Sequence, residues 1–176
     1  MAQLLMLRPH LRDLPPVPPL PAGYRLRLAQ AEADEEALAA VLAAAFANPW
    51  DSARVRRELT AAPDVRAVYA VTWQDRPVAT AASRSLPDHF PGSGYVHWVG
   101  THPEHQRRGL ALALLARLLR DFAERGDRDA VLETDDSRLP ALRAYLACGF
   151  LPVYDVAGED HRARWSAVFQ ALGARW

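Results

Sequence analysis

Several residue types are scarce or missing in this chain. Its 176 residues contain no lysine, no isoleucine and a single cysteine, Cys148. One cysteine excludes an internal disulfide bond and any zinc site built from several cysteines. No histidine pair or carboxylate cluster has the spacing of metal ligands, so we expect no metal site. Cys148, just before Gly149-Phe150, is predicted to be a small buried side chain.

The chain also lacks an excess of charge and a long apolar run. The chain has 21 arginines, and its aspartates and glutamates together also number 21. This balance excludes a general attraction to nucleic acid or to an acidic membrane. The apolar stretch Leu110–Leu119 is interrupted by Arg117 and is too short to cross a bilayer. Charged residues also interrupt residues 1–22, unlike a signal peptide, so we expect a cytoplasmic protein.

What is present is the composition of one globular domain. Half of the residues are hydrophobic and 24% are charged. Prolines at positions 15, 16, 18, 19 and 21 exclude a helix in that segment. We therefore expect residues 1–22 to form a proline-rich N-terminal arm and residues 23–176 to form the domain.

Hydrophobic periodicity within residues 23–176 switches repeatedly between the strand and helix patterns. Capping residues, glycines and prolines mark the element ends. The order β-α-α-β-β-β-α-β-α-β-α predicts an α/β domain in which a mixed sheet carries helices on both faces. Strands are expected at 24–28, 65–73, 78–86, 94–101, 130–134 and 150–156, and helices at 34–46, from Asp51 or Ser52 to before Pro63, at 109–125, 137–148 and 160–172.

One run carries most of the chemical information. The predicted strand ending at 99–101 leads through Gln-Arg-Arg-Gly-Leu-Ala, residues 106–111, into a helix. The first N–H groups of a helix have no intrahelical acceptor, and the macrodipole adds positive charge there. Gly109 lets an anion approach the backbone, and Arg107 and Arg108 add formal charge. The run predicts a phosphate or pyrophosphate site; an arginine-rich helix cap facing solvent is the alternative.

The Q-x-x-G-x-A spacing after a strand resembles the acyl-CoA loop of the GCN5-related N-acetyltransferases (GNAT family). Residues 138–150 resemble the N-x-x-A-x-x-x-Y-x-x-x-G-F helix of the same family, and both motifs stand in the family's order. The resemblance spans roughly residues 23–156 and implies the GNAT-like acyl-CoA N-acyltransferase fold. It also implies acetyl transfer from acetyl-CoA (coenzyme A) to a primary amine. The small size of the chain favours a small-molecule acceptor.

Three features depart from the family pattern. Arg138 stands where the family often has asparagine, and Thr101 replaces the usual aliphatic residue. The predicted helix 160–172 occupies sequence in which the family normally forms a last strand. This would leave an open sheet edge beside residues 150–156, and such edges are rarely left uncovered. Gln3–Leu7 is a candidate cover, either within the chain or in a two-fold partner, which would make a homodimer.

The resemblance assigns residues to the cofactor. The backbone N–H groups of 107–111 would hold the pyrophosphate, with the side chains of Gln106 and Arg108 nearby. The backbone around 99–101 would lie beside the pantetheine and acetyl group, where an N–H of Val99 or Gly100 would polarise the carbonyl. Gly100 is consistent with a bulge at that point. The complete expected set is Val99, Gly100, Thr101, Gln106, Arg107, Arg108, Gly109, Leu110, Ala111, Arg138 and Tyr145.

Two residues are predicted to move protons. By its match to the family's helix tyrosine, Tyr145 would protonate the leaving thiolate. His97 would be the base, sharing a strand face with Val99 by simple alternation. The alternatives are a tyrosine packed at a helix–sheet boundary and a histidine bonded within the sheet. Glu133 on the next strand is the second candidate base.

Two aromatic residues in predicted loops, Trp50 and Phe90, are candidates to contact an apolar or aromatic amine. The alternative function is a non-catalytic acyl-CoA-binding sensor or regulatory module of the same fold. Such a module would require the phosphate loop but neither His97 nor Tyr145.

Overall fold

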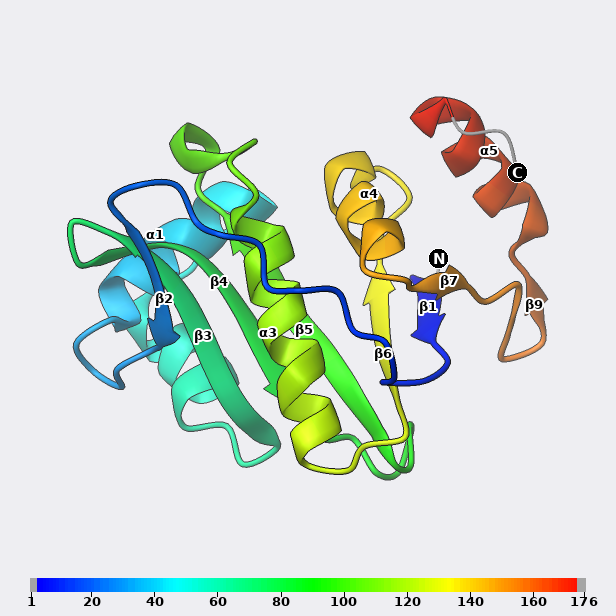
Figure 1. Cartoon of the computed structure of the whole chain (residues 1–176), viewed down its shortest axis with the longest axis horizontal. Coiled ribbons are helices and arrows are strands. Elements are labelled where there is room, and N and C mark those ends of the chain that lie inside the picture. Colours follow the sequence, from blue (N-terminus) through cyan, green and yellow to red (C-terminus); the bar gives the residue numbers. More distant parts are fainter. Residues whose placement is uncertain (1–2, 174–176) are drawn as a thin grey trace.

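The apolar runs of the sequence form one seven-stranded sheet in the computed structural model, which describes residues 3–173 (Figure 1). The strand order is β2-β3-β4-β5-β6-β1-β7. The β5–β6 pair is parallel, and every other neighbouring pair is antiparallel. The strands are β1 (Leu4–Arg8), β2 (Tyr24–Leu28), β3 (Val65–Trp73), β4 (Arg76–Arg84), β5 (Ser93–Thr101), β6 (Asp129–Thr134) and β7 (Leu151–Pro152).

Helices cover both faces of the sheet, as the sequence predicts. On one face α1 approaches β5 so closely that a Cβ on Gly100 would lie 3.1 Å from the Cβ of Ala45. On the other face α3 leaves no room for a Cβ on Gly94, which would lie 2.3 Å from the Phe122 ring. The helices are α1 (Glu35–Phe46), α2 (Ser52–Val55) with a π-helical continuation (Arg56–Thr60), α3 (Leu110–Glu124), α4 (Leu139–Ala147) and α5 (Arg162–Leu172).

The helix predictions follow from local chemistry that the structure retains. The Asp51 side chain accepts a hydrogen bond from the Arg54 N–H at 2.7 Å and so caps α2. Leucines spaced three and four residues apart along α3 turn inward, and Leu114, Leu115 and Leu118 are fully buried. Within residues 3–173, no helix has the length and hydropathy needed to cross a bilayer.

The N-terminal strand β1 lies inside the sheet, although the sequence predicts a domain boundary after residue 22. Leu4–Arg8 pairs with Thr134–Ala130 of β6 on one side and, through Met6 and Leu7, with β7 on the other. The run expected to cover the edge near residues 150–156 therefore does so within its own chain. The proline-rich segment then crosses over α3 (Figure 1), where Arg120 donates to the Pro15 carbonyl at 3.1 Å.

The predicted strand 150–156 is wrong in its length. Only Leu151–Pro152 joins the large sheet, whereas β8 (Asp155–Val156) pairs with β9 (Glu159–Asp160) in a separate hairpin. The carbonyl of Val153 accepts from the Trp165 indole at 3.2 Å, and that of Tyr154 from the His161 N–H at 2.7 Å. These bonds turn the chain toward α5. The predicted helix 160–172 is confirmed as α5.

Candidate functional site

The parallel strands β5 and β6 separate from each other after a short paired segment. Ser93–Tyr95 pairs with Asp129–Val131, and the remainder of the two strands diverges toward the start of α4 (Figure 1). We call the two diverging strand segments, residues 96–101 and 132–134, the wedge. Strands that separate leave backbone N–H and C=O groups without ladder partners. The wedge therefore offers an extended ligand a strand edge to pair with.

A bulge changes the side-chain alternation along β5. Thr80 of β4 is opposite Gly100, but Ala82 is opposite His97, so β5 contains one extra residue. The extra residue is Trp98, with φ of 48°. Val96 and Val99 both join the core under α3, three positions apart.

Simple alternation therefore fails across Trp98, and one expectation is wrong: the His97 side chain does not share a strand face with Val99. The expected bulge near Gly100 is present, and its extra residue is Trp98, two residues before Gly100.

His97 lies in a fixed hydrogen-bonded position. Its Nδ1 is 2.9 Å from Nη1 of Arg84, which also pairs with Asp64. Burial, with the charge of Arg84 as the second cause, lowers the pKa of His97 to about 4. Since a guanidinium can only donate, Nδ1 accepts and the ring proton lies on Nε2. This arrangement leaves His97 no free lone pair with which to take a proton from an ammonium group.

This burial predicts a dependence of stability on pH. Between pH 6.5, the ordinary pKa of His97, and the lowered value of about 4, the unfolded chain binds a proton that the folded protein does not. Stability should therefore fall as pH decreases through this window, by up to ~3 kcal/mol. In His97→Gln, the loss of unfolding free energy between about pH 7 and about pH 4.5 should be smaller, as measured by urea unfolding.

His89→Gln, which changes an exposed loop histidine, is the control and should keep the wild-type pH dependence. Equal acid sensitivity in wild type and His97→Gln would contradict a buried neutral ring.

The predicted phosphate loop has the geometry of an anion site. The Gln106 side chain donates to the Thr101 carbonyl at 3.3 Å and ties the loop to the end of β5. Arg107 and Gly109 have φ values of 60° and 76°, and α3 begins directly afterwards. Within the described residues, the N–H groups of 107–111 have no hydrogen-bond acceptor. A Cβ on Gly109 would meet no atom within 4 Å, so the loop presents an open surface.

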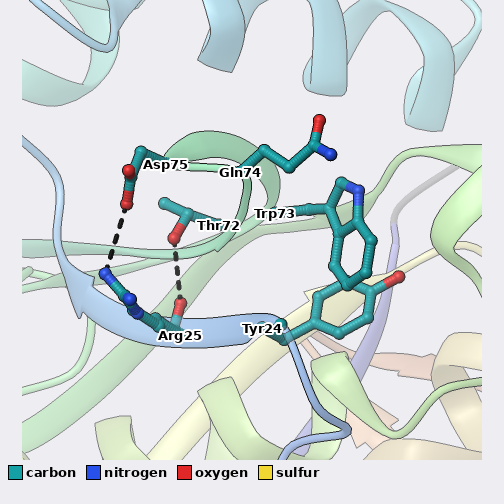
Figure 2. A pocket seen from close by; sticks show the side chains of 7 residues that line it. Tyr24, Arg25, Thr72, Trp73, Gln74 and Asp75 are labelled. Carbon is teal, nitrogen blue, oxygen red and sulfur yellow. Dashed lines mark hydrogen bonds and ion pairs between the residues drawn. The ribbon is translucent and has the colours of Figure 1, made fainter.

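A cavity of about 410 Å³ lies at the start of β2 and the end of β3 (Figure 2). The Tyr24 and Trp73 rings pack 4.7 Å apart in it, and the Tyr24 hydroxyl is 2.8 Å from Nδ1 of His105. The guanidinium of Arg108 is 5.9 Å from the Tyr24 ring. These contacts hold the 3₁₀ turn Pro103–His105 against β2 and so position the loop. The cavity is lined by Gly23, Tyr24, Arg25, Thr72, Trp73, Gln74 and Asp75.

Tyr145 of α4 and Arg138, the residue that precedes this helix, lie next to the wedge. Tyr145 is 4% exposed, and within residues 3–173 its hydroxyl has no hydrogen-bond partner. Burial raises the pKa of Tyr145 to about 12, against the opposing charge of Arg138. Arg138 spans the mouth of the wedge, where its Nη2 donates to the Val99 carbonyl at 3.2 Å and its guanidinium lies 4.1 Å from the Phe46 ring.

Glu133 stands on the β6 wall of the wedge. The Tyr95 hydroxyl donates to its Oε2 at 2.9 Å, while Oε1 has no partner among the described residues. Burial, followed by the charge of Glu133, raises the pKa of Tyr95, so this phenol remains a donor. Phe90 stacks on Tyr95 at 5.6 Å, near the start of β5. Trp50 lies at the other end, 4.7 Å from the Trp98 ring.

Sequence reasoning missed Arg84, and it attributed Tyr95 and Trp98 to core packing without singling them out. Arg84 and Tyr95 matter through partners on other strands, which no local pattern reveals. Trp98 has a positive φ, which is uncommon for a tryptophan. The residue type therefore gave no indication of the bulge. Within the described part of the chain, no group of three or more His, Cys, Asp or Glu side chains could hold a metal ion.

Comparison with known proteins places this geometry in a family. Residues 35–150 match the Acetyltransferase (GNAT) family. A mycothiol acetyltransferase from Actinosynnema mirum is 34% identical over 158 residues, which are 84% of this chain and 51% of that protein. The chain thus spans about half the length of the mycothiol acetyltransferases that it matches.

Solved structures agree. A GNAT-family protein from Novosphingobium aromaticivorans is 28% identical with a TM-score of 0.59, covering 85% of this chain and 59% of that one. The ribosomal-protein-S18-alanine N-acetyltransferase from Escherichia coli shares the fold, with 20% identity and a TM-score of 0.62 over 78% of this chain and 87% of its own. By motif, fold and family match, the chain belongs to the GNAT acetyltransferase family.

Proposed function

We propose that the chain is an acetyl-CoA-dependent N-acetyltransferase that acetylates a primary amine of a small molecule. The observation that carries this proposal is the row of N–H groups at 107–111, which have no acceptor among the described residues and surround the open position of Gly109, beside a wedge with a strand edge. These features fit the pyrophosphate and the extended pantetheine of acetyl-CoA. When bound, acetyl-CoA supplies the acetyl group as a thioester, which an amine attacks.

The backbone of β5 would orient the acetyl group. The Val99 carbonyl faces the wedge, since Arg138 reaches it from α4. In an extended strand the N–H and C=O of one residue point to the same side, so the Val99 N–H faces the wedge as well. A fixed donor at this point would stabilise negative charge that develops on the carbonyl oxygen. Of the two donors considered from the sequence, Val99 is the one that we propose.

Two side chains would handle the protons. Tyr145, kept protonated by burial, holds a proton at Oη for the departing sulfur. Glu133 has one carboxylate oxygen without a partner among the described residues and would take a proton from the amine, directly or through water. We propose Glu133 in place of His97, because the Nδ1 lone pair of His97 already accepts from Arg84.

The proposal is tested by binding and by turnover. Acetyl-CoA and CoA are expected to raise the melting temperature, whereas ATP and NAD are not. With acetyl-CoA present, release of free thiol should depend on an added primary amine. Stabilisation by ATP or NAD but not by CoA would overturn the proposal. Tight acetyl-CoA binding without amine-dependent thiol release across a broad panel would indicate the non-catalytic binding module.

Gly109→Val is expected to weaken acetyl-CoA binding at least tenfold. The new side chain would meet no protein atom, so it would project into the space that the phosphate needs, and it would strain a residue whose φ is 76°. Calorimetry measures the affinity. Gly126→Val is the matched control, because Gly126 has φ of 80° and equally open surroundings at the far end of α3. A folded Gly109→Val protein with wild-type affinity would refute the loop assignment.

A further inference from the structure

Arg138 brings a positive charge to the mouth of the wedge with no acidic partner among the described residues. Its guanidinium makes one hydrogen bond, to the Val99 carbonyl, and stacks on the Phe46 ring. A guanidinium has five N–H donors, so most of its donor capacity is unused. Other partly buried arginines of this chain pair with carboxylates, among them Arg27 with Asp34, Arg84 with Asp64 and Arg117 with Asp121.

Aromatic side chains with unused donors lie next to this charge. The Phe46 ring, on which Arg138 stacks, is 5.0 Å from the Trp98 ring, and Trp98 is 4.7 Å from Trp50. The indole N–H groups of both tryptophans are buried and have no hydrogen-bond partner within the described residues. Buried donors without acceptors cost free energy. A ligand with an apolar body and acceptor oxygens would match this lining.

The guanidinium carbon of Arg138 lies over the Phe46 ring, 4.1 Å from its centroid. When a guanidinium covers an aromatic ring with its flat face, its N–H groups point outward from the edge of the guanidinium plane. There they can donate two hydrogen bonds to the two oxygens of a carboxylate. This edge lies beside Val99, whose N–H we assign to the acetyl carbonyl. The amine of an α-amino acid is two bonds from its carboxylate carbon. A carboxylate bound at Arg138 would therefore hold that amine close to the acetyl group.

We propose that Arg138 is the specificity-determining residue for the acceptor, and that the acceptor class is an α-amino acid with an apolar or aromatic side chain. This inference rests on the proposed function and deepens it. It reassigns Arg138, which the family resemblance places with the cofactor, to the carboxylate of the acceptor. The aromatic cluster of Phe46, Trp50 and Trp98 would contact the apolar side chain.

The test uses pairs of amines that differ by one carboxylate: phenylalanine with phenethylamine, and tryptophan with tryptamine. Wild type is expected to show kcat/KM at least tenfold higher for the amino acid of each pair, the size of a charge-assisted hydrogen bond. In Arg138→Gln that ratio should fall to about one through a higher KM for the amino acid. Arg138→Lys keeps the charge but loses the paired N–H donors of the guanidinium, so its ratio should lie between those of wild type and Arg138→Gln.

Calorimetry separates the two roles of Arg138. Acetyl-CoA affinity should stay within about twofold of wild type in Arg138→Gln. Arg143→Gln, on the exposed side of the same helix, is the control and should retain full selectivity. If Arg138→Gln loses acetyl-CoA affinity while the ratio between paired amines is unchanged, Arg138 serves the cofactor and the inference is overturned.

A binding measurement tests the inference independently of turnover. Phenylalanine is expected to bind the CoA complex of the wild-type protein at least tenfold more tightly than phenethylamine does, and this difference should vanish in Arg138→Gln. Equal binding of the two compounds to wild type overturns the assignment of Arg138. Absence of amine-dependent thiol release with every amine, despite this binding difference, overturns the proposed function alone.

Discussion

Replacing Tyr145 by phenylalanine is expected to lower kcat by ~10²–10⁴-fold, the usual contribution of a general acid. The substitution removes a single oxygen from a ring that is 4% exposed and packs at 6.2 Å from Phe150, so the fold should not change. Acetyl-CoA affinity should change little, because the loss concerns a proton rather than a binding contact. Steady-state kinetics on a confirmed acceptor, with calorimetry for affinity, measure both quantities.

The pH profile gives this prediction a second readout. Because burial raises the pKa of Tyr145 to about 12, its ionisation should produce no fall in kcat through the ordinary alkaline range. Tyr154→Phe is the control, since Tyr154 is 40% exposed and lies in the turn after β7. A Tyr145→Phe protein with wild-type kcat would transfer the acid role to another group or to water.

Deleting residues 1–20 is expected to abolish stable folding or to lower the melting temperature severely. The deletion removes β1 from between β6 and β7, exposes both of their edges and takes away the fully buried Leu4 and Met6. It also removes Arg8, which is buried and donates to the Cys148 carbonyl at the end of α4. Thermal unfolding and light scattering measure the outcome.

Point variants keep this prediction testable if the truncated protein does not fold. Met6→Ala should cost ~2–5 kcal/mol of unfolding free energy, as large-to-small changes in a core do. Leu28→Ala, at a 55% exposed position on the edge strand β2, should cost less than about 0.5 kcal/mol. A truncated protein with an unchanged melting temperature and an unchanged oligomeric state would show that β1 contributes nothing to the sheet.

The parts of the site that could be predicted from sequence depend on neighbours along the chain. A helix start, a glycine at positive φ and adjacent arginines make the loop at 106–111 recognisable, because the unsatisfied N–H groups belong to consecutive residues. The elements themselves follow from periodicity in the same local way. Tyr145 was assigned through the resemblance of residues 138–150 to the family's helix motif, and the structure adds the burial that keeps its hydroxyl protonated.

The sequence by itself determined the order of helices and strands between residues 24 and 147, the turn into α3 at residues 106–111 and the membership of the GNAT family, since each depends on short-range patterns. Only the tertiary structure decided that β1 enters the sheet between β6 and β7, because that pairing joins residues more than 120 positions apart. It also decided that one extra residue at Trp98 separates the faces of His97 and Val99, and that Arg84 occupies the lone pair of His97. The hydrogen bond from Arg138 to the Val99 carbonyl was likewise decided only by the tertiary structure. Long-range pairing and a one-residue register change leave no periodic trace in a sequence, yet they decide which side chains face the wedge.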